Sequence, residues 1–590
     1  MMTADAWITL VAVVTVLVVL GRNLAPASMT LLGVVVALLV LGVIDPAQAF
    51  AGFSNPAPIT VAALYVLAGA VQQTGVLEST VGRVLGGATG QRALLARVVA
   101  PTIASSAFLN NTPIVAMIAP AVSGWAEQRQ LPASRFLMPV SFAAILGGCI
   151  TAIGTSTNLV VSGLLVGAGE APLALFELAA VGVPLALGGG LLIVLLAPLV
   201  LPDRGAAMQD FEEHMRDFTV AMQVVDGGLL DGQTVESAGL RSLQGVYCAQ
   251  LTRGERRISP VRPDQDLQAG DELLFVGKVD RILDLQRNRG LRSTEDRHLE
   301  RVGGSEGQFF EAVVGPGSRL VGSTIKDVGF RQRHDAAVLA IHRAGQRVDA
   351  QLGQVEIRAG DALLLLAGQG YQNRWKATGD FLLVAGTGQS RPVQGRKARV
   401  TGLVTLALVL VAGSGLVPIL EASLVAAIAL IGLRVIRLPQ ARAAIDTDVL
   451  VVIASAFGLG AAVQTSGLAT VAADVLLRGT QTWGQTGALV GVLLVTMLLT
   501  ELLTNNAAAV LAFPLAAAAA DQVGADIRPF AITIALGASL SFLSPIGYQT
   551  NLMVYSLGGY RFFDFARLGA PITLLVIIGS VLIVPQVWPL

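Results

Sequence analysis

The chain has 590 residues, of which 53% are hydrophobic and only 14% are charged, and its mean hydropathy is +0.67. A soluble chain of this length carries about a quarter charged residues, so this composition excludes an ordinary soluble protein and favours a polytopic membrane protein. The 40 basic and 40 acidic residues give zero net charge, which argues against nucleic acid as a partner. The two cysteines, Cys149 and Cys248, are too few for a disulfide framework.

Apolar segments of membrane-spanning character fill the first third of the chain. They are expected at residues 7–20, 29–43, 59–71, 94–109, 112–122, 136–153 and 173–201. The polar turn Asn110-Asn111-Thr112 separates two segments that are each short for a full crossing, so we predict a re-entrant hairpin at about residues 94–122. A second interruption is Gly154-Thr155-Ser156-Thr157-Asn158. Unwound polar stretches at bilayer depth are tolerated only where they line a cavity or are buried in protein.

The composition changes abruptly after Leu201, where a polar segment begins. This segment is itself repeated, because Leu230-Asp231-Gly232-Gln233-Thr234 matches Leu320-Val321-Gly322-Ser323-Thr324, and Ala269-Gly270-Asp271 matches Ala359-Gly360-Asp361. Each copy is predicted to hold short strands, a helix after Thr234 or Thr324, and a turn at the Ala-Gly-Asp triplet. The predicted domains are a membrane repeat at 1–201, inserted domains at 202–298 and 299–397, and a second membrane repeat at 398–590.

The second apolar block repeats the landmarks of the first at a nearly constant spacing. The stretch that begins Val71-Gln72 recurs at Val463-Gln464, the polar turn recurs as Thr504-Asn505-Asn506, and the interruption recurs as Gly547-Tyr548-Gln549-Thr550-Asn551. The spacings are 392, 394 and 393 residues, so the membrane part is a tandem repeat, with a second re-entrant hairpin predicted at about residues 485–520. Paired repeats with broken helices at corresponding positions indicate a transporter binding site.

Loop charges predict the orientation of the chain in the membrane. If neither hairpin crosses, each half has five crossings and the halves are inverted. Most basic residues of the short loops then fall on one side, which the positive-inside rule assigns to the cytoplasm. The arginines on this side are Arg22, Arg83, Arg92, Arg97, Arg129, Arg135, Arg434, Arg437, Arg442, Arg561 and Arg567. We therefore expect an inner (plasma) membrane protein with a cytoplasmic insert and both termini outside.

The repeat, the hairpin tips and the paired Gly-x-x-x-Asn breaks resemble the divalent-anion:sodium symporter (DASS) family of the ion-transporter superfamily. The resemblance covers residues 1–201 and 399–590 and implies an α-helical, elevator-type carrier. Family tips usually read Ser-Asn-Thr, whereas this chain has Asn-Asn-Thr and Thr-Asn-Asn, and Thr155-Ser156-Thr157 stands where prolines are common. This form looks more like the sulfate-transporting members. The inserted copies resemble two α/β TrkA-C (RCK C-terminal) domains, which implies dimerisation and a nucleotide-type regulator.

The unwound stretches suit an anion and sodium for physical reasons. Helix starts expose N–H groups and a partial positive charge, which favour an anion, whereas unwound carbonyls and helix C-termini favour Na⁺. The predicted anion-binding residues are Asn110, Asn111, Thr112, Thr157, Thr504, Asn505, Asn506 and Thr550. The predicted Na⁺ ligands are Asn110, Asn111, Gly154 and Asn158 at one site, and Thr504, Asn505, Gly547 and Asn551 at the other. The alternative is that these turns only satisfy helix ends in a packed bundle.

One intramembrane carboxylate, Glu501, lies one turn before the second tip, and its repeat-equivalent position is Ala107. Intramembrane carboxylates are functional candidates by default. Glu501 is therefore a candidate coupling carboxylate for a proton or a cation, with a hydrogen-bonded structural role as the alternative.

These observations predict a secondary active transporter and not an enzyme: a homodimeric, sodium-coupled symporter of a divalent anion, with sulfate as the first choice. A sodium/dicarboxylate symporter and a proton-coupled or arsenite-type carrier are alternatives within the superfamily. A ligand-gated potassium-type channel is the alternative from a different class, although the chain has no Thr-Val-Gly-Tyr-Gly filter sequence. The glycine-rich stretches of the insert lack the G-x-x-x-x-G-K-[ST] phosphate loop, so no ATPase is predicted.

Overall fold

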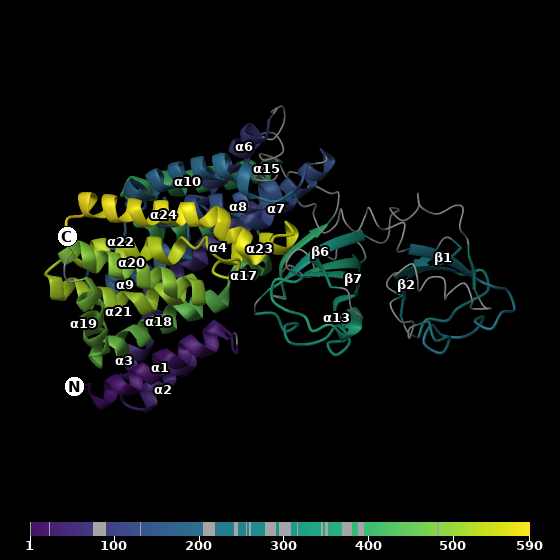
Figure 1. The fold of residues 1–590 in the computed structure, drawn as a ribbon, viewed down its shortest axis with the longest axis horizontal. Coiled ribbons are helices and arrows are strands. Elements are labelled where there is room, and N and C mark those ends of the chain that lie inside the picture. Colours follow the sequence, from purple (N-terminus) through teal and green to yellow (C-terminus); the bar gives the residue numbers. More distant parts are fainter. Residues whose placement is uncertain are drawn as a thin grey trace.

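A helical body and two inserted sheets make up the chain in the computed structural model (Figure 1). The structure describes residues 2–22, 24–74, 90–129, 131–203, 219–240, 246–254, 256–258, 261–262, 264–277, 291–293, 308–315, 317–343, 346–348, 352–367, 380–386, 395–480 and 483–590. Arg83, used in the orientation argument, lies outside these residues. The marked chain ends lie at the end of the helical body away from the inserted sheets. That arrangement fits the expected topology, while the identity of the cytoplasmic side stays a prediction.

The first half of the helical body runs from the N-terminus to residue 200. Its helices are α1 (Ala4–Gly21), α2 (Ala27–Val40), α3 (Pro46–Phe50), the 3₁₀ helix η1 (Ala51–Ser54), α4 (Pro56–Thr74), α6 (Gln91–Ser106), α7 (Asn111–Gln128), α8 (Ser134–Gly148), α9 (Ser156–Gly167) and α10 (Ala179–Val200). Residues 107–110 separate α6 from α7, which begins at the tip residue Asn111, and the break at residues 149–155 separates α8 from α9.

The second half repeats this order. Its helices are α15 (Gly395–Gly413), α16 (Ile419–Gly432), α17 (Leu438–Ala444), α18 (Thr447–Thr465), α19 (Leu468–Thr480), α20 (Gly484–Leu502), α21 (Asn505–Val523), α22 (Ile527–Ser539), α23 (Gln549–Leu557) and α24 (Phe562–Val587). Local chemistry explains where the unwound stretches end, because Thr155 caps α9 and Thr504 caps α21 with their side-chain oxygens.

Six helical stretches of the described chain are long and apolar enough to cross a membrane. They are Pro46–Thr74, Ala179–Val200, Thr447–Thr465, Gly484–Leu502, Asn505–Val523 and Phe562–Val587. Further apolar helices of 10–17 residues accompany them, including α8, α9 and α22. The prediction of a mainly helical, polytopic membrane protein is confirmed at this level.

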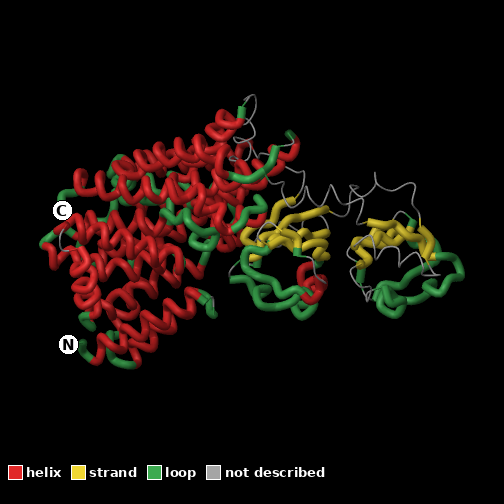
Figure 2. The backbone as a smooth tube through the Cα atoms, in the orientation of Figure 1, coloured by secondary structure: helices red, strands yellow, loops and turns green. Residues whose placement is uncertain are grey.

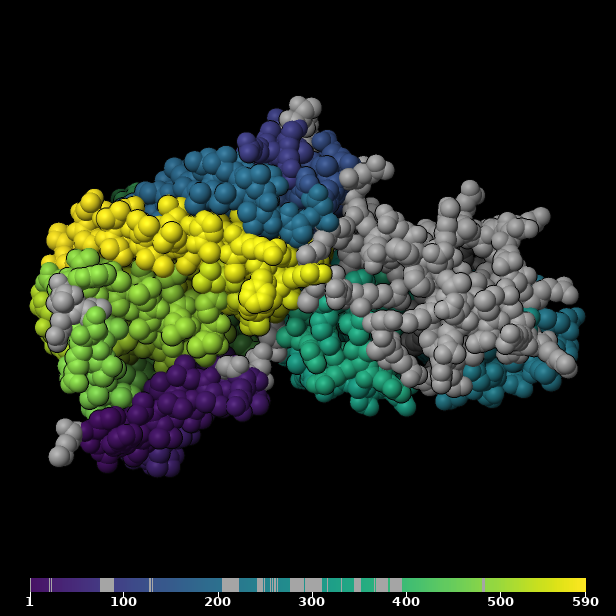
Figure 3. Space-filling model, in the orientation of Figure 1, coloured from purple at the N-terminus to yellow at the C-terminus, as the bar shows by residue number. Residues whose placement is uncertain are grey.

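The two halves interleave instead of lying side by side. α9 of the first half packs against α21 and α22 of the second, and α23 of the second half packs against α7 and α8 of the first. One continuous apolar core joins both halves, with the rings of Phe142 and Phe542 meeting edge to face at 5.0 Å. The space-filling view shows the purple-to-blue and green-to-yellow halves sharing one body (Figure 3).

The insert contains two antiparallel five-stranded sheets of the same strand order (Figure 2). The first, in the order β3-β2-β4-β1-β5, has the strands β1 (Thr219–Val224), β2 (Val246–Arg253), β3 (Arg256–Ile258), β4 (Glu272–Gly277) and β5 (Leu291–Ser293). The second, in the equivalent order β8-β7-β9-β6-β10, has β6 (Gln308–Val314), β7 (Ala336–Arg343), β8 (Gln346–Arg347), β9 (Ala362–Ala367) and β10 (Phe381–Gly386), with the helices α13 (Phe330–His334) and η2 (Leu352–Gln354). We call these the first and second insert units.

Each insert unit ties its Ala-Gly-Asp turn to a strand by the same ion pair. Arg253 holds Asp271 at 2.6 Å in the first unit, and Arg343 holds Asp361 at 2.8 Å in the second, each through two guanidinium nitrogens. Thr234 and Thr324 begin turns, because their side-chain oxygens accept bonds from the backbone N–H groups three residues on. In the second unit the helix predicted after Thr324 follows this turn as α13, whereas the equivalent residues 241–245 of the first unit lie outside the described residues.

Candidate functional site

The first hairpin tip is organised around Asn111, the first residue of α7, which is fully buried. Its Oδ1 accepts a hydrogen bond from Ser106 Oγ at 2.6 Å, and its Nδ2 donates to the hydroxyl of Tyr548 at 2.5 Å. The end of α8 approaches this side chain so closely that a Cβ at Gly148 would lie 2.5 Å from Asn111 Oδ1. A side chain at position 148 would therefore displace the tip.

The second tip repeats part of this arrangement. Asn505 Oδ1 accepts a hydrogen bond from Thr500 Oγ1 at 2.9 Å, and Thr500 is the repeat equivalent of Ser106. Each tip asparagine is thus held by a hydroxyl from the last turns of the preceding helix. These two hydroxyls were not predicted from the sequence, although their common spacing of 394 residues was a signal that could have found them.

Each tip also contacts the start of the broken helix of the other half. Asn506 Oδ1 accepts hydrogen bonds from the hydroxyls of Ser156 and Thr157, both at 3.2 Å. Thr112 donates to Gln549 Oε1 at 3.3 Å. Three of the predicted anion-binding residues, Thr112, Thr157 and Asn506, therefore lie where hairpin tips and helix starts of opposite halves meet.

Tyr548 is the residue that links these elements and that sequence reasoning missed. Besides its bond to Asn111, its hydroxyl interacts with the side chains of Thr155 and Asn505. It therefore contacts both hairpin tips and the cap of α9. Tyr548 stands at the repeat-equivalent position of Thr155, but the sequence offered no signal that a side chain 437 residues after Asn111 would reach it.

The two breaks are braced by equivalent asparagines. Asn158 Nδ2 donates to the carbonyls of Gly148 and Thr151 at 3.0 and 2.8 Å, and Asn551 Nδ2 donates to those of Ser541 and Ser544, both at 3.1 Å. These bonds satisfy carbonyls that the unwound backbone would otherwise leave unpaired.

The amide oxygens of the two asparagines differ in their surroundings. Asn551 Oδ1 accepts from Ser141 Oγ at 2.7 Å, and the same hydroxyl lies 2.9 Å from Thr550 Oγ1. Asn158 Oδ1 is buried and has no hydrogen-bond partner among the described residues. A buried acceptor without a donor is costly unless something electropositive binds it. The first break therefore retains an oxygen suited to a cation.

The second break carries a carboxylate where the first has none. Glu501 accepts hydrogen bonds from Ser541 Oγ and Ser544 Oγ, both at 2.7 Å, and a Cβ at Gly547 would lie 2.6 Å from its Oε2. In the first half, Gly154 packs in the equivalent place against the carbonyl of Gly148. The two junctions between tip and break therefore differ in charge.

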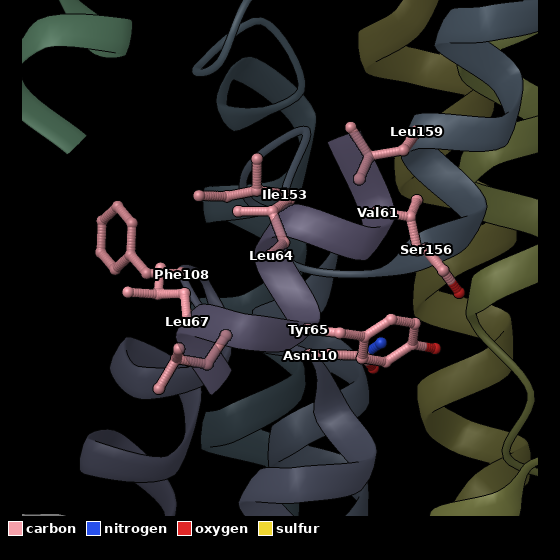
Figure 4. A pocket seen from close by; sticks show the side chains of 10 residues that line it. Val61, Leu64, Tyr65, Leu67, Phe108, Asn110, Ile153, Ser156 and Leu159 are labelled. Carbon is pink, nitrogen blue, oxygen red and sulfur yellow. The ribbon is translucent and has the colours of Figure 1, made fainter. Parts of the chain in front are cut away.

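A small pocket, with a cavity volume of about 20 Å³, opens beside the first tip. Figure 4 shows Tyr65 of α4 and Asn110 of the tip side by side, with Ser156 at the start of α9 facing the same region. Its other lining residues are apolar: Val61, Leu64, Leu67, Phe108, Leu109, Ile153 and Leu159. Asn110 therefore lines a largely apolar cavity, while Asn111 faces the polar junction.

The remaining predicted residues take supporting positions. Thr504 is exposed and accepts from the backbone N–H of Ala507 at 3.4 Å, as the cap of α21. In the part of the chain that the structure describes, no group of three or more His, Cys, Asp or Glu side chains could hold a metal ion. Any cation in these junctions would therefore rely on amide, hydroxyl and carbonyl oxygens, together with Glu501 at the second.

Paired hairpins and broken helices that meet inside one apolar helical body define a polytopic membrane transporter. The model of the citrate transporter (CitMHS) family matches residues 15–537, and the chain belongs to this family. It is 34% identical to a sulfur deprivation response regulator of Chlamydomonas reinhardtii, over 93% of this chain and 96% of the relative. It is 33% identical to an uncharacterised transporter of Synechocystis, over 98% and 97%, and 25% identical to sodium/sulfate cotransporter 1 of Chlamydomonas reinhardtii, over 92% and 86%.

Proposed function

We propose that this transporter is a sodium-coupled symporter of a divalent anion, with sulfate as the principal substrate, and that it works by an elevator mechanism. The family is one of transporters, and the relatives named as sodium/sulfate cotransporters support both the ion and the anion. The cell inner membrane, a cytoplasmic insert and a homodimer belong to the same proposal. Regulation through the insert units, by a nucleotide-type ligand of TrkA-C-like domains, is a further part of it.

The observation that carries the proposal is the unpartnered oxygen of Asn158. This Oδ1 is buried at the first break, and the Nδ2 of the same side chain donates to the carbonyl of Gly148, which packs against Asn111 of the first tip. Its own amide nitrogen is committed to two backbone carbonyls, so the orientation of the side chain is fixed. An oxygen held in this way supports Na⁺ binding at Gly154 and Asn158, with Asn110 and Asn111 completing the site from the tip.

The anion would bind where the tips meet the starts of the opposite broken helices. Helix starts at Asn111, Ser156, Asn505 and Gln549 converge there with hydroxyl and amide side chains. None of the hydrogen bonds found at these four helix starts involves a lysine or arginine, so dipoles, neutral donors and co-bound sodium would hold the dianion. Sodium binding would assemble tip and break, so the sodium gradient would drive uptake.

A carboxylate is the second candidate substrate. The description of the family as citrate transporters favours it, and the largely apolar lining of the pocket beside Asn110 suits a carbon skeleton that sulfate lacks. A proton-coupled or arsenite-type carrier is a third candidate, which the carboxylate of Glu501 favours.

Counterflow in proteoliposomes tests the proposal. The purified chain is reconstituted, and exchange of labelled sulfate, succinate and citrate is measured with sodium, with potassium in its place, and across a pH gradient. Saturable sulfate exchange that requires sodium is expected. Exchange of carboxylates alone would select the second candidate, dependence on the pH gradient would select the third, and non-saturable flux would favour a channel.

A matched pair of variants tests the sodium site itself. Asn158→Leu and Asn551→Leu each remove two amide donors to backbone carbonyls, but only Asn158 has a free oxygen to lose. We expect Asn158→Leu to raise the sodium concentration for half-maximal uptake by about tenfold more than Asn551→Leu, since about 1.4 kcal/mol of cation binding is lost. Equal effects in the two variants would contradict a role for this oxygen.

A further inference from the structure

The two insert units differ in what their Ala-Gly-Asp turns touch. In the second unit, Ser556 of α23 donates a hydrogen bond to the carbonyl of Gly360. A Cβ at Gly360 would lie 2.6 Å from Leu552 Cδ1 of the same helix. In the first unit, no atom of the described residues lies within 4 Å of a Cβ at the equivalent Gly270. The second turn is therefore docked and the first is open, although both glycines have nearly the same φ, +83° and +82°.

Buried side chains extend this docking contact. Val313 and Ala362 of the second unit belong to the apolar core of the helical body, and Leu382 packs against that core. The strand β6 contacts α23, which is the second half of the second broken helix. The strand β10 contacts α7, which is the second half of the first hairpin. Figure 1 shows β6 beside α23. The buried side chains of the first unit form a separate cluster.

The docked face of α23 has a repeat equivalent in α9 that is covered by a different element. Leu552 and Ser556 correspond to Leu159 and Gly163 at a spacing of 393 residues. In the first half, the start of α4 covers this face, because Asn55 Nδ2 donates to the carbonyl of Gly163 at 3.2 Å. A Cβ at Gly163 would lie only 2.7 Å from the Cβ of Ala57.

The second half lacks this cover in the present arrangement. Counted from the first helical residues, Pro56 and Thr447, the start of α18 is equivalent to that of α4 at a spacing of 391, one residue less than at Val71 and Val463, and Asp446 and Asp448 stand in place of Asn55 and Ala57. Asn55 and Ala57 are buried, whereas Asp446 and Asp448 are exposed. α4 packs along α9, but within the described residues α18 makes no extensive contact with α23.

An inverted repeat makes this difference meaningful. In a transporter built from two such halves, the opposite state is reached when the halves exchange their arrangements. α4 would then leave α9, and the start of α18 would close on Leu552 and Ser556. The turn of the second insert unit now covers that face.

We propose that residues 358–361 form a lock on α23 that is compatible with only one state of the transporter, because the turn and the start of α18 compete for the same face. A ligand or partner that holds the second unit in its docked position would arrest transport, and one that draws it away would release transport. This inference rests on the proposed alternating exchange, but its first two tests do not depend on the transported substrate.

The first test asks whether the turn docks. In a chain with Cys149→Ala and Cys248→Ala, the pair Gly360→Cys/Leu552→Cys is oxidised, and loss of free thiols is measured by maleimide gel shift. The matched control pair is Gly270→Cys/Leu552→Cys, in which the same turn with the same backbone strain lies away from α23. Disulfide formation in the first pair alone is expected. Equal formation in both pairs, or in neither, would overturn the docking contact.

The second test asks whether docking excludes α18. The pair Asp448→Cys/Ser556→Cys reports the closed α18–α23 contact by its rate of disulfide formation. Gly360→Val, whose side chain meets Leu552, should raise this rate about fivefold over Gly270→Val, as expected when about 1 kcal/mol of docking is removed. The same rate in both variants would show that the turn does not compete with α18.

The third test connects the lock to transport. Oxidation of the Gly360→Cys/Leu552→Cys pair should lower sodium-dependent sulfate uptake at least about tenfold, with recovery on reduction. Full uptake by the oxidised pair would mean that the unit travels with α23, and would overturn the lock. If the unmodified chain takes up no sulfate, the proposed function fails, and the first two tests still decide the docking and the competition.

Discussion

Replacement of Asn111 by alanine should abolish sodium-dependent uptake. The side chain is fully buried, and its loss leaves the Ser106 hydroxyl without its acceptor and removes one of the three partners of the Tyr548 hydroxyl. A buried group left unpaired costs about 1–3 kcal/mol, so the assembled tip loses about this much. The upper value reduces the population of the assembled tip by roughly 150-fold. The assay is sulfate uptake into proteoliposomes at equal amounts of reconstituted protein.

Two comparisons separate this effect from general damage. Membrane insertion and the size-exclusion profile of Asn111→Ala should match those of the unaltered chain, because the change affects only the tip. Asn111→Ala and Tyr548→Phe each remove the same hydrogen bond, so the double variant should lose about 1 kcal/mol less than the sum of the single losses. Uptake within twofold of the unaltered chain in both Asn111→Ala and Asn505→Ala would refute the assignment of the tips as the binding site.

Three further predictions concern charge, packing and pH. Glu501→Gln keeps the side-chain volume but removes the carboxylate charge, so the sodium requirement should rise about tenfold if this group assists a cation; an unchanged requirement would assign Glu501 a structural role. Gly148→Ala places a Cβ 2.5 Å from Asn111 Oδ1 and should impair uptake severely, whereas Gly124→Ala on α7, with no described atom within 4 Å, should not. Burial lowers the pKa of His334 to about 4. The neutral His334 side chain therefore contributes its full stabilisation of the second insert unit above pH 6.5. This contribution to the free energy of unfolding should fall by up to about 3 kcal/mol as the pH drops to 4, because the unfolded chain binds the proton more tightly. Thermal unfolding between pH 7 and pH 4.5 measures this loss, and His334→Phe should reduce it.

Local properties of the chain account for what could be predicted. Hydropathy identified the helical body, and the segment predicted as a second re-entrant hairpin at about residues 485–520 contains α20 and α21, which run from Gly484 to Val523, while its re-entrant path stays a prediction. The helix starts fall at Asn111 and Asn505 because polar residues there cap or interrupt apolar segments. The turn that follows Thr234 has an equally local cause: Ser237 and Gly239 favour a turn, and Gly239 has a φ of +69°.

Contacts between distant segments could not be predicted in the same way. Asn506 meets Thr157, and Asn111 meets Tyr548, only because the two halves interleave, and no local pattern encodes that geometry. The repeat itself would suggest two equal junctions. The junctions differ in Glu501 and in the free oxygen of Asn158. That this oxygen has no hydrogen-bond donor can be recognised only from the positions of all the described residues around it.

The sequence by itself determined the membrane class and the positions at which helices break, because hydropathy and helix capping act over a few residues, and it predicted the tandem repeat. The tertiary structure alone decided which tip meets which helix and which insert unit docks. The turns at Gly270 and Gly360 carry the same Ala-Gly-Asp triplet and nearly the same backbone angle, yet only the second contacts α23. Their difference arises from where each unit lies against the helical body, and that position cannot be predicted from the repeated sequence.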